Sequence, residues 1–138
     1  MTTYKINYLA VLVSGVAMYV LGAIWYISFQ GPWMELSGLT EEAIVAAGGG
    51  VDSYFVSFVT YLLGAYAMAL IFEAMKITKM QKGALTGALI GSLIVGGNIF
   101  TNNSYELKPM GLSVLNAGFS TVSLTVVGAI LGAWKKKA

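Results

Sequence analysis

The sequence predicts an all-α fold, an integral membrane four-helix bundle with a short extracytoplasmic amphipathic helix between spans one and two. Of its 138 residues, 57% are hydrophobic and only 10% are charged, against about 25% charged residues in an average soluble domain. The apolar residues fall into four runs, each close to the roughly 20 residues that a helix needs to cross a bilayer. We place these spans at about residues 6–29, 53–75, 83–102 and 109–134, in a single domain covering residues 1–138.

The first apolar run, residues 6–29, follows Lys5 and is predicted to be a membrane span. A lysine before an apolar run is also the pattern of a secretory signal. This run is longer than the 7 to 15 residues of a signal core, and no small-residue cleavage site follows Phe29. A first span is therefore favoured over a signal peptide.

The segment between the first two spans is polar and contains four acidic residues and no lysine. Thr40 can cap a short helix, because its hydroxyl can accept a free backbone N–H of the first turn. Glu41 and Glu42 would then lie at the positive end of the helix dipole. The three glycines of residues 48–50 are predicted to end this helix.

A proline marks the start of the fourth span, and two glycines lie inside the third. Pro109 suits the first turn of the fourth helix, where its missing N–H has no intrahelical partner. Gly96 and Gly97 lie inside the third span, the shortest of the four, and predict a local break or kink there.

The lysines predict the orientation of the chain. With four spans, seven of the eight lysines lie on one side and only Lys108 on the other. Cytoplasmic loops carry the excess of basic residues. Both termini are therefore expected in the cytoplasm, with the acidic segment on the outer surface.

Small residues recur at four-residue spacing on two spans. Gly83, Gly87 and Gly91 share one face of the third span, and Gly128 and Gly132 share a face of the fourth. In lipid, such faces allow close approach of helix backbones. Two interpretations remain open: packing inside one bundle, or assembly into a homo-oligomer or a larger membrane complex.

Polar side chains cluster in the outer half of the predicted bundle. By helical spacing, Asn98, Thr101 and Asn102 are expected on the face that Gly87 and Gly91 occupy. Stripes are also expected on the fourth span (Ser113, Asn116, Ser120 and Ser123) and on the second (Ser53, Ser57 and Thr60). We expect an outward-opening polar recess lined by Asn98, Thr101, Asn102, Asn116, Ser120, Trp25, Tyr26 and Gln30. These groups either bond one another, line a solute or ion pathway, or form a lipid or small-ligand site.

The sequence offers little for catalysis. Cysteine and histidine are both absent, which excludes thiolate and imidazole chemistry, so no enzymatic activity, metal or cofactor is expected. A net charge of +2 without arginine does not suggest nucleic acid. Glu73, one turn from Lys76, is interpreted as one partner of a surface ion pair rather than a proton relay.

Several segments resemble the bacterial membrane family catalogued as domain of unknown function 1761. They are Gly22 with Trp25 and Tyr26, Thr101-Asn102, Asn116-Ala117-Gly118, and residues 128–134. The resemblance implies a small membrane protein with about four spans and no established activity. It also implies a proline soon after Trp-Tyr and a histidine soon after Asn-Ala-Gly. This chain instead has Ser28 and Phe29 at the first place, and Phe119 and Ser120 at the second.

Two functional hypotheses follow. The first is a non-enzymatic structural or accessory protein of the bacterial inner membrane, partnered by the lipid bilayer and assembling as a homo-oligomer or as a subunit of a membrane complex. The alternative is a small channel or transporter with an outward-facing polar recess on spans three and four. An enzyme acting on lipid is a distant third.

Overall fold

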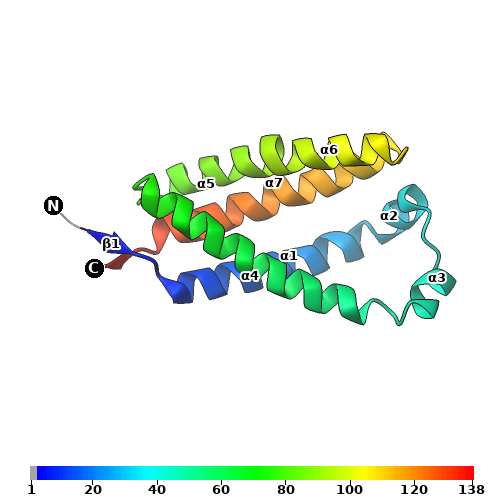
Figure 1. Cartoon of the computed structure of the whole chain (residues 1–138), viewed down its shortest axis with the longest axis horizontal. Coiled ribbons are helices and arrows are strands. Elements are labelled where there is room, and N and C mark those ends of the chain that lie inside the picture. Colours follow the sequence, from blue (N-terminus) through cyan, green and yellow to red (C-terminus); the bar gives the residue numbers. More distant parts are fainter. Residues whose placement is uncertain (1–2) are drawn as a thin grey trace.

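The computed structural model describes residues 3–138 and forms a bundle of four long helices (Figure 1). Each is long and apolar enough to cross a membrane: α1 (Tyr8–Ser28), α4 (Val51–Ala74), the continuous helix Met80–Tyr105, and α7 (Met110–Ala133). The third comprises α5 (Met80–Leu89), the π-helical segment η1 (Ile90–Val95) and α6 (Gly96–Tyr105). The expectation of an all-α membrane bundle with four apolar spans is confirmed.

The bundle consists of two antiparallel helix pairs. One pair is α1 with α4, and the other is the α5–η1–α6 helix with α7; α7 also packs against α1 and so joins the pairs. Helix α4 lies close to the other pair at the end that carries both termini and diverges from it toward the end that carries α2 (Gln30–Ser37) and α3 (Glu41–Ala46), where α1 and α2 stay against α7 (Figure 1). We call these the lysine end and the distal end.

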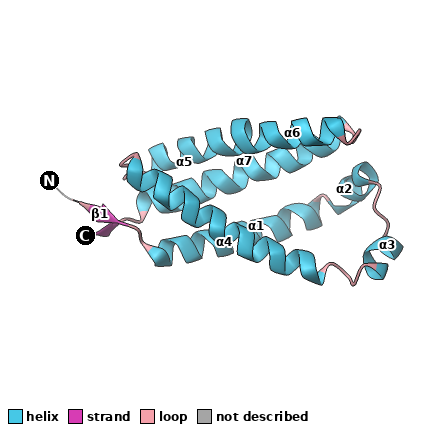
Figure 2. Cartoon of the chain, in the orientation of Figure 1, coloured by secondary structure: helices cyan, strands magenta, loops and turns pink. Residues whose placement is uncertain are grey.

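The two termini are held together by a small clasp. Strand β1 (Tyr4–Lys5) pairs antiparallel with β2 (Lys136–Lys137) (Figure 2). Next to the strands, the Asn7 side chain caps α1 by accepting the Ala10 N–H at 3.2 Å. The Asn7 amide nitrogen also donates to the Trp134 carbonyl at 3.4 Å. The sequence analysis did not predict these strands.

The α5–α7 contact is a backbone-to-backbone contact made possible by glycine. A Cβ atom added at Gly83, Gly87 or Gly91 would collide with a carbonyl oxygen of α7, namely that of Gly128, Leu124 or Ser120 respectively. At Gly132 an added Cβ would lie 2.6 Å from the Lys79 carbonyl oxygen. These five glycines thus pack inside the chain, so they no longer motivate an oligomer interface.

The π-helical segment changes the register of the third span. In the stripe of glycines that faces α7, the step from Gly91 to Gly96 is five residues rather than four, and the Gly96 N–H donates to the Gly91 carbonyl. The extra residue keeps Gly96, rather than the bulky Val95, against Ala117 of α7. The kink expected at Gly96–Gly97 is therefore a π turn that ends just before Gly96.

The distal connection contains two short helices rather than one. Helix α3 begins as expected, with the Thr40 hydroxyl accepting the Ala43 N–H at 3.2 Å. The glycines of residues 48–50 follow it with φ between +71° and +89°. Helix α2 was not expected. It accommodates Pro32, because a proline in the first turn removes only an N–H that has no intrahelical partner. Pro109 is the N-cap of α7, one residue before the expected position.

Candidate functional site

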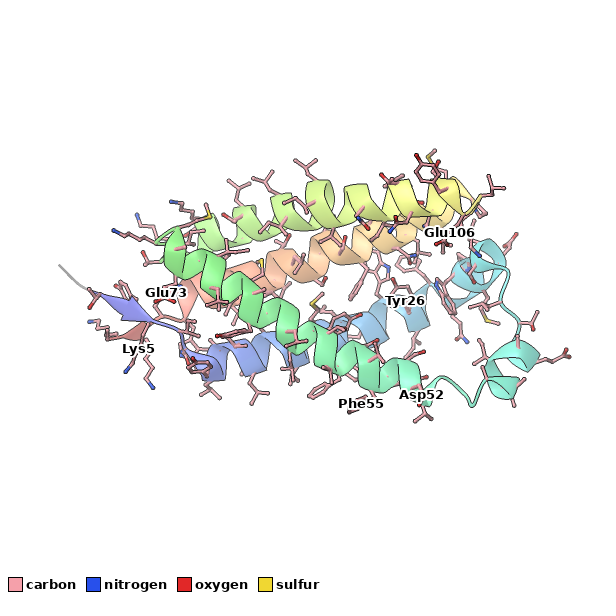
Figure 3. The ribbon with its side chains drawn as sticks, in the orientation of Figure 1. Lys5, Tyr26, Asp52, Phe55, Glu73 and Glu106 are labelled. Atoms are coloured by element: carbon pink, nitrogen blue, oxygen red, sulfur yellow. The ribbon has the colours of Figure 1, made fainter. Side chains whose placement is uncertain are left out.

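A recess of about 470 Å³ lies between the two helix pairs in the distal half of the bundle. All four long helices contribute to it: Met18, Tyr26, Tyr61, Val95, Ile99, Asn102, Asn103, Glu106, Asn116, Phe119 and Ser120. We call it the distal recess. Figure 3 shows Tyr26 and Glu106 at this end of the bundle, on the α1 and α6 sides.

The α1 wall of the distal recess is fixed to α7 by two hydrogen bonds. The Tyr26 hydroxyl donates to Oδ1 of Asn116 at 2.9 Å, and the Trp25 indole N–H donates to the Leu115 carbonyl at 3.2 Å. Gly118 allows the Trp25 ring to pack closely on α7, because an added Cβ would lie 3.0 Å from the indole ring. The segments that carry the family resemblance on α1 and α7 thus contact each other directly.

An aromatic cluster forms one side of the distal recess. The buried ring of Phe119 lies 5.4 Å from the Tyr26 ring and 6.1 Å from the Tyr61 ring, centroid to centroid. Both contacts are tilted or edge-on, which is the favourable geometry for aromatic pairs. The three rings come from α1, α4 and α7, so the cluster bridges the two helix pairs.

Amides, a hydroxyl and a carboxyl form the other side. Asn103 donates from Nδ2 to the Ser113 hydroxyl at 3.0 Å, and Ser120 donates to the Gly91 carbonyl at 2.7 Å. Asn102 and Glu106 lie on the last two turns of the third span, Glu106 being the C-cap of α6. Glu106 is the one charged side chain among the described residues that line the recess.

Four of the eight predicted recess residues line the distal recess: Asn102, Asn116, Ser120 and Tyr26. The other four lie elsewhere. Trp25 is turned toward α7, the Thr101 hydroxyl donates to the Gly97 carbonyl, and Gln30 is exposed at the start of α2. Asn98 is exposed and accepts from the Asn102 amide at 2.8 Å.

The prediction that Asn98, Thr101 and Asn102 share the face of Gly87 and Gly91 is wrong. The π turn inserts one residue between the glycine stripe and these positions, which rotates them away from α7. The stripe expected on α4 does not line the recess either, since Ser53 and Thr60 are exposed.

Seven lining residues were missed by the sequence analysis: Met18, Tyr61, Val95, Ile99, Asn103, Glu106 and Phe119. Asn103 takes the α7-facing place that regular helical spacing assigns to Asn102. Tyr61 and Phe119 lie within apolar runs and look like ordinary span residues. Glu106 lies four residues beyond Asn102, and that helical spacing is a signal that could have placed it near the recess.

The two ends of the bundle differ in charge. Seven of the eight lysines lie at the lysine end, whereas five of the six acidic residues lie at the distal end: Glu35, Glu41, Glu42, Asp52 and Glu106. A cleft near charges of one sign concentrates ions of the opposite sign. The distal recess therefore lies in a region that attracts cations. Within residues 3–138, no three His, Cys, Asp or Glu side chains are grouped to hold a metal ion.

The fold and this recess define a small helical membrane protein whose four apolar helices enclose a polar and aromatic site near one end. Residues 9–132 match the family described as Protein of unknown function (DUF1761), and the chain belongs to that family. The resemblance seen in the sequence is thereby confirmed. No match was found among the curated proteins or the solved structures.

Proposed function

We propose that this DUF1761 protein is a non-enzymatic membrane protein that binds a small organic cation in the distal recess, as the binding step of a small transporter. The observation that carries the proposal is the combination of three aromatic rings with a single carboxylate around one cavity. Rings that surround an ammonium group attract it through their negative faces, by about 0.5 to 2 kcal/mol each. Glu106 would balance the charge of such a ligand.

The size and polarity of the recess suit a small molecule. Its volume of about 470 Å³ falls within the range of about 300 to 1,000 Å³ typical of ligand pockets. Asn102, Asn103 and Asn116 add amide groups that can accept from or donate to a polar substituent of the ligand. The excess of acidic residues at the distal end would raise the local concentration of cations at its entrance.

Binding of choline and of its neutral isostere 3,3-dimethylbutan-1-ol to the full chain in nanodiscs tests this proposal. Choline should bind more tightly than the alcohol, because only choline gains from the rings and the carboxylate. Tyr61→Leu and Glu106→Gln should each weaken choline binding by about five- to tenfold. Equal binding of choline and the alcohol would refute a cation site.

Two matched control variants separate the recess from the rest of the distal end. Tyr54→Leu removes a tyrosine of α4 that is 60% exposed and does not line the recess, and Glu42→Gln removes a carboxylate of α3. Both should leave choline binding within about twofold of the wild type. If Glu42→Gln weakens binding as much as Glu106→Gln, the effect is diffuse attraction and the proposed site is wrong.

Assembly with a second copy is a second candidate function. Gly64 of α4 favours it, because a Cβ added there meets no atom of the described chain within 4 Å. It leaves a small outward-facing patch beside Ser57 and Thr60 that another helix could approach closely. Gly64→Leu should then reduce the oligomer mass measured in mild detergent, and an unchanged mass would exclude this surface.

A further inference from the structure

A second cleft, of about 420 Å³, lies at the lysine end, against the clasp that joins the termini. Its lining comes from four separate segments: β1 with the start of α1, the end of α4, the α4–α5 turn, and the chain that leaves α7. Figure 3 shows Lys5 and Glu73 at this end of the bundle. We call it the terminal cleft; it is separate from the distal recess.

Three lysines from three of these segments converge on the terminal cleft: Lys5, Lys76 and Lys135. Glu73 is the one carboxylate among the described residues that line it, so the lining carries an excess of positive charge. The other four lysines of this end lie outside the lining. The arrangement therefore predicts that an anion binds in the cleft itself, rather than being attracted diffusely to the basic surface around it.

Lys135 is partly buried although the chain end that carries it could extend into water. Its ammonium nitrogen lies 5.8 Å from the centre of the fully buried Phe72 ring. Burial lowers the pKa of Lys135, and the negative charge of Glu73 offsets part of that effect. A further anion in the cleft would stabilise this desolvated ammonium group.

The position of Lys76 is fixed by the end of α4. Lys76 has φ +54°, and the next residue donates its N–H to the Phe72 carbonyl at 2.9 Å. The side chains of Phe72 and Ile77 are both fully buried. This is a Schellman ending with its hydrophobic contact, and it holds the turn rigidly beside the cleft.

The cleft lies at the depth of lipid headgroups. The apolar helices α1, α4 and α7 all begin or end within a few residues of it, at Tyr8, Ala74 and Ala133. Trp134 and Tyr4 line it, and such aromatic residues are enriched at the membrane–water interface. The anion that suits a cleft at this depth is the phosphate group of a lipid.

We propose that the terminal cleft binds the phosphate headgroup of an anionic membrane lipid. Lys5, Lys76 and Lys135 contact the phosphate oxygens, while the acyl chains follow the apolar surface beside α4. Basic pockets between transmembrane helices are a common form of lipid recognition. This site is independent of the solute site proposed above, because no residue lines both cavities.

The test is titration of the full chain in neutral detergent with phosphatidylglycerol and with phosphatidylcholine, followed by native mass spectrometry of the one-lipid complex. Phosphatidylglycerol should be retained preferentially. The double variant Lys5→Gln with Lys135→Gln should weaken its binding by about 30-fold, since each lysine near a membrane surface contributes on the order of 1 kcal/mol to attraction. The matched control, Lys79→Gln with Lys82→Gln, removes the same charge outside the cleft and should change binding by less than about threefold.

Glu73→Gln should have the opposite effect on lipid binding. Removing the carboxylate of the cleft should tighten phosphatidylglycerol binding by about fivefold, a result that misfolding cannot produce. Equal losses in the two lysine variants would refute the proposal, because the attraction would then be diffuse. Displacement of the lipid by millimolar inorganic phosphate would overturn the lipid assignment in favour of a soluble phosphate.

Discussion

Replacing Gly87 by alanine tests the close packing of α5 on α7 with a single added atom. The new Cβ would collide with the Leu124 backbone carbonyl, so the helices would have to separate. Overpacking a tight contact costs about 1 to 3 kcal/mol, and the upper part of that range applies because backbone cannot rotate away. Alanine regains at most about 1 kcal/mol through its helix preference. We expect a net loss of about 2 kcal/mol in the free energy of unfolding.

Gly97→Ala is the matched control on the same helix. A Cβ at Gly97 meets no atom of residues 3–138 within 4 Å, so this variant should be neutral or stabilised by up to about 1 kcal/mol. The free energies of both variants can be measured by reversible unfolding in mixed detergent micelles, followed by circular dichroism. If Gly87→Ala proves as stable as Gly97→Ala, the α5–α7 contact is not the close packing described above.

Three further predictions concern individual side chains. Ser14→Ala should be neutral or stabilising by about 1 kcal/mol in the same unfolding assay, because the buried Ser14 hydroxyl has no partner among the described residues. By contrast, Ser120→Ala removes the hydrogen bond from the Ser120 hydroxyl to the Gly91 carbonyl of η1 and should destabilise the protein by about 1 kcal/mol. A double-mutant cycle with Tyr26→Phe and Asn116→Ala should give a coupling energy of about 0.6 to 1.7 kcal/mol, and a value near zero would contradict their hydrogen bond. Leu107→Gly should raise the free energy of unfolding by about 1 kcal/mol, because glycine adopts the Leu107 φ of +57° without strain and the side chain that is lost is 91% exposed. An unchanged or lower free energy of unfolding would show that the backbone at Leu107 is not strained.

The membrane fold was predictable because each of its signals is local. An apolar run of the right length specifies a span, and the ends of α4 and α7 fall within two residues of those predicted. The cap at Thr40 and the glycines after α3 were likewise predictable, since a helix end is determined by a few adjacent residues.

The features that the sequence analysis did not predict depend on contacts between residues that are distant in the sequence. The π turn is explained only by the partner helix, where Gly96 rather than Val95 fits against Ala117. The pairing of β1 with β2 joins chain ends that no sequence pattern relates. Tyr61 enters the distal recess because of how α4 crosses α1, so a sequence reading treats it as one more apolar residue of a span.

Binding of a small organic cation in the distal recess is the central claim, and asparagine-selective NMR tests it most directly. The chain has five asparagines, of which Asn102, Asn103 and Asn116 line the recess while Asn7 lines the terminal cleft. In nanodiscs with ¹⁵N-asparagine labelling, choline should shift the side-chain amide signals of the three recess asparagines and leave Asn7 unchanged. The neutral alcohol should shift the recess signals only at higher concentrations than choline requires. Unchanged recess signals at saturating choline, or an equal shift at Asn7, would contradict a cation site between the helix pairs.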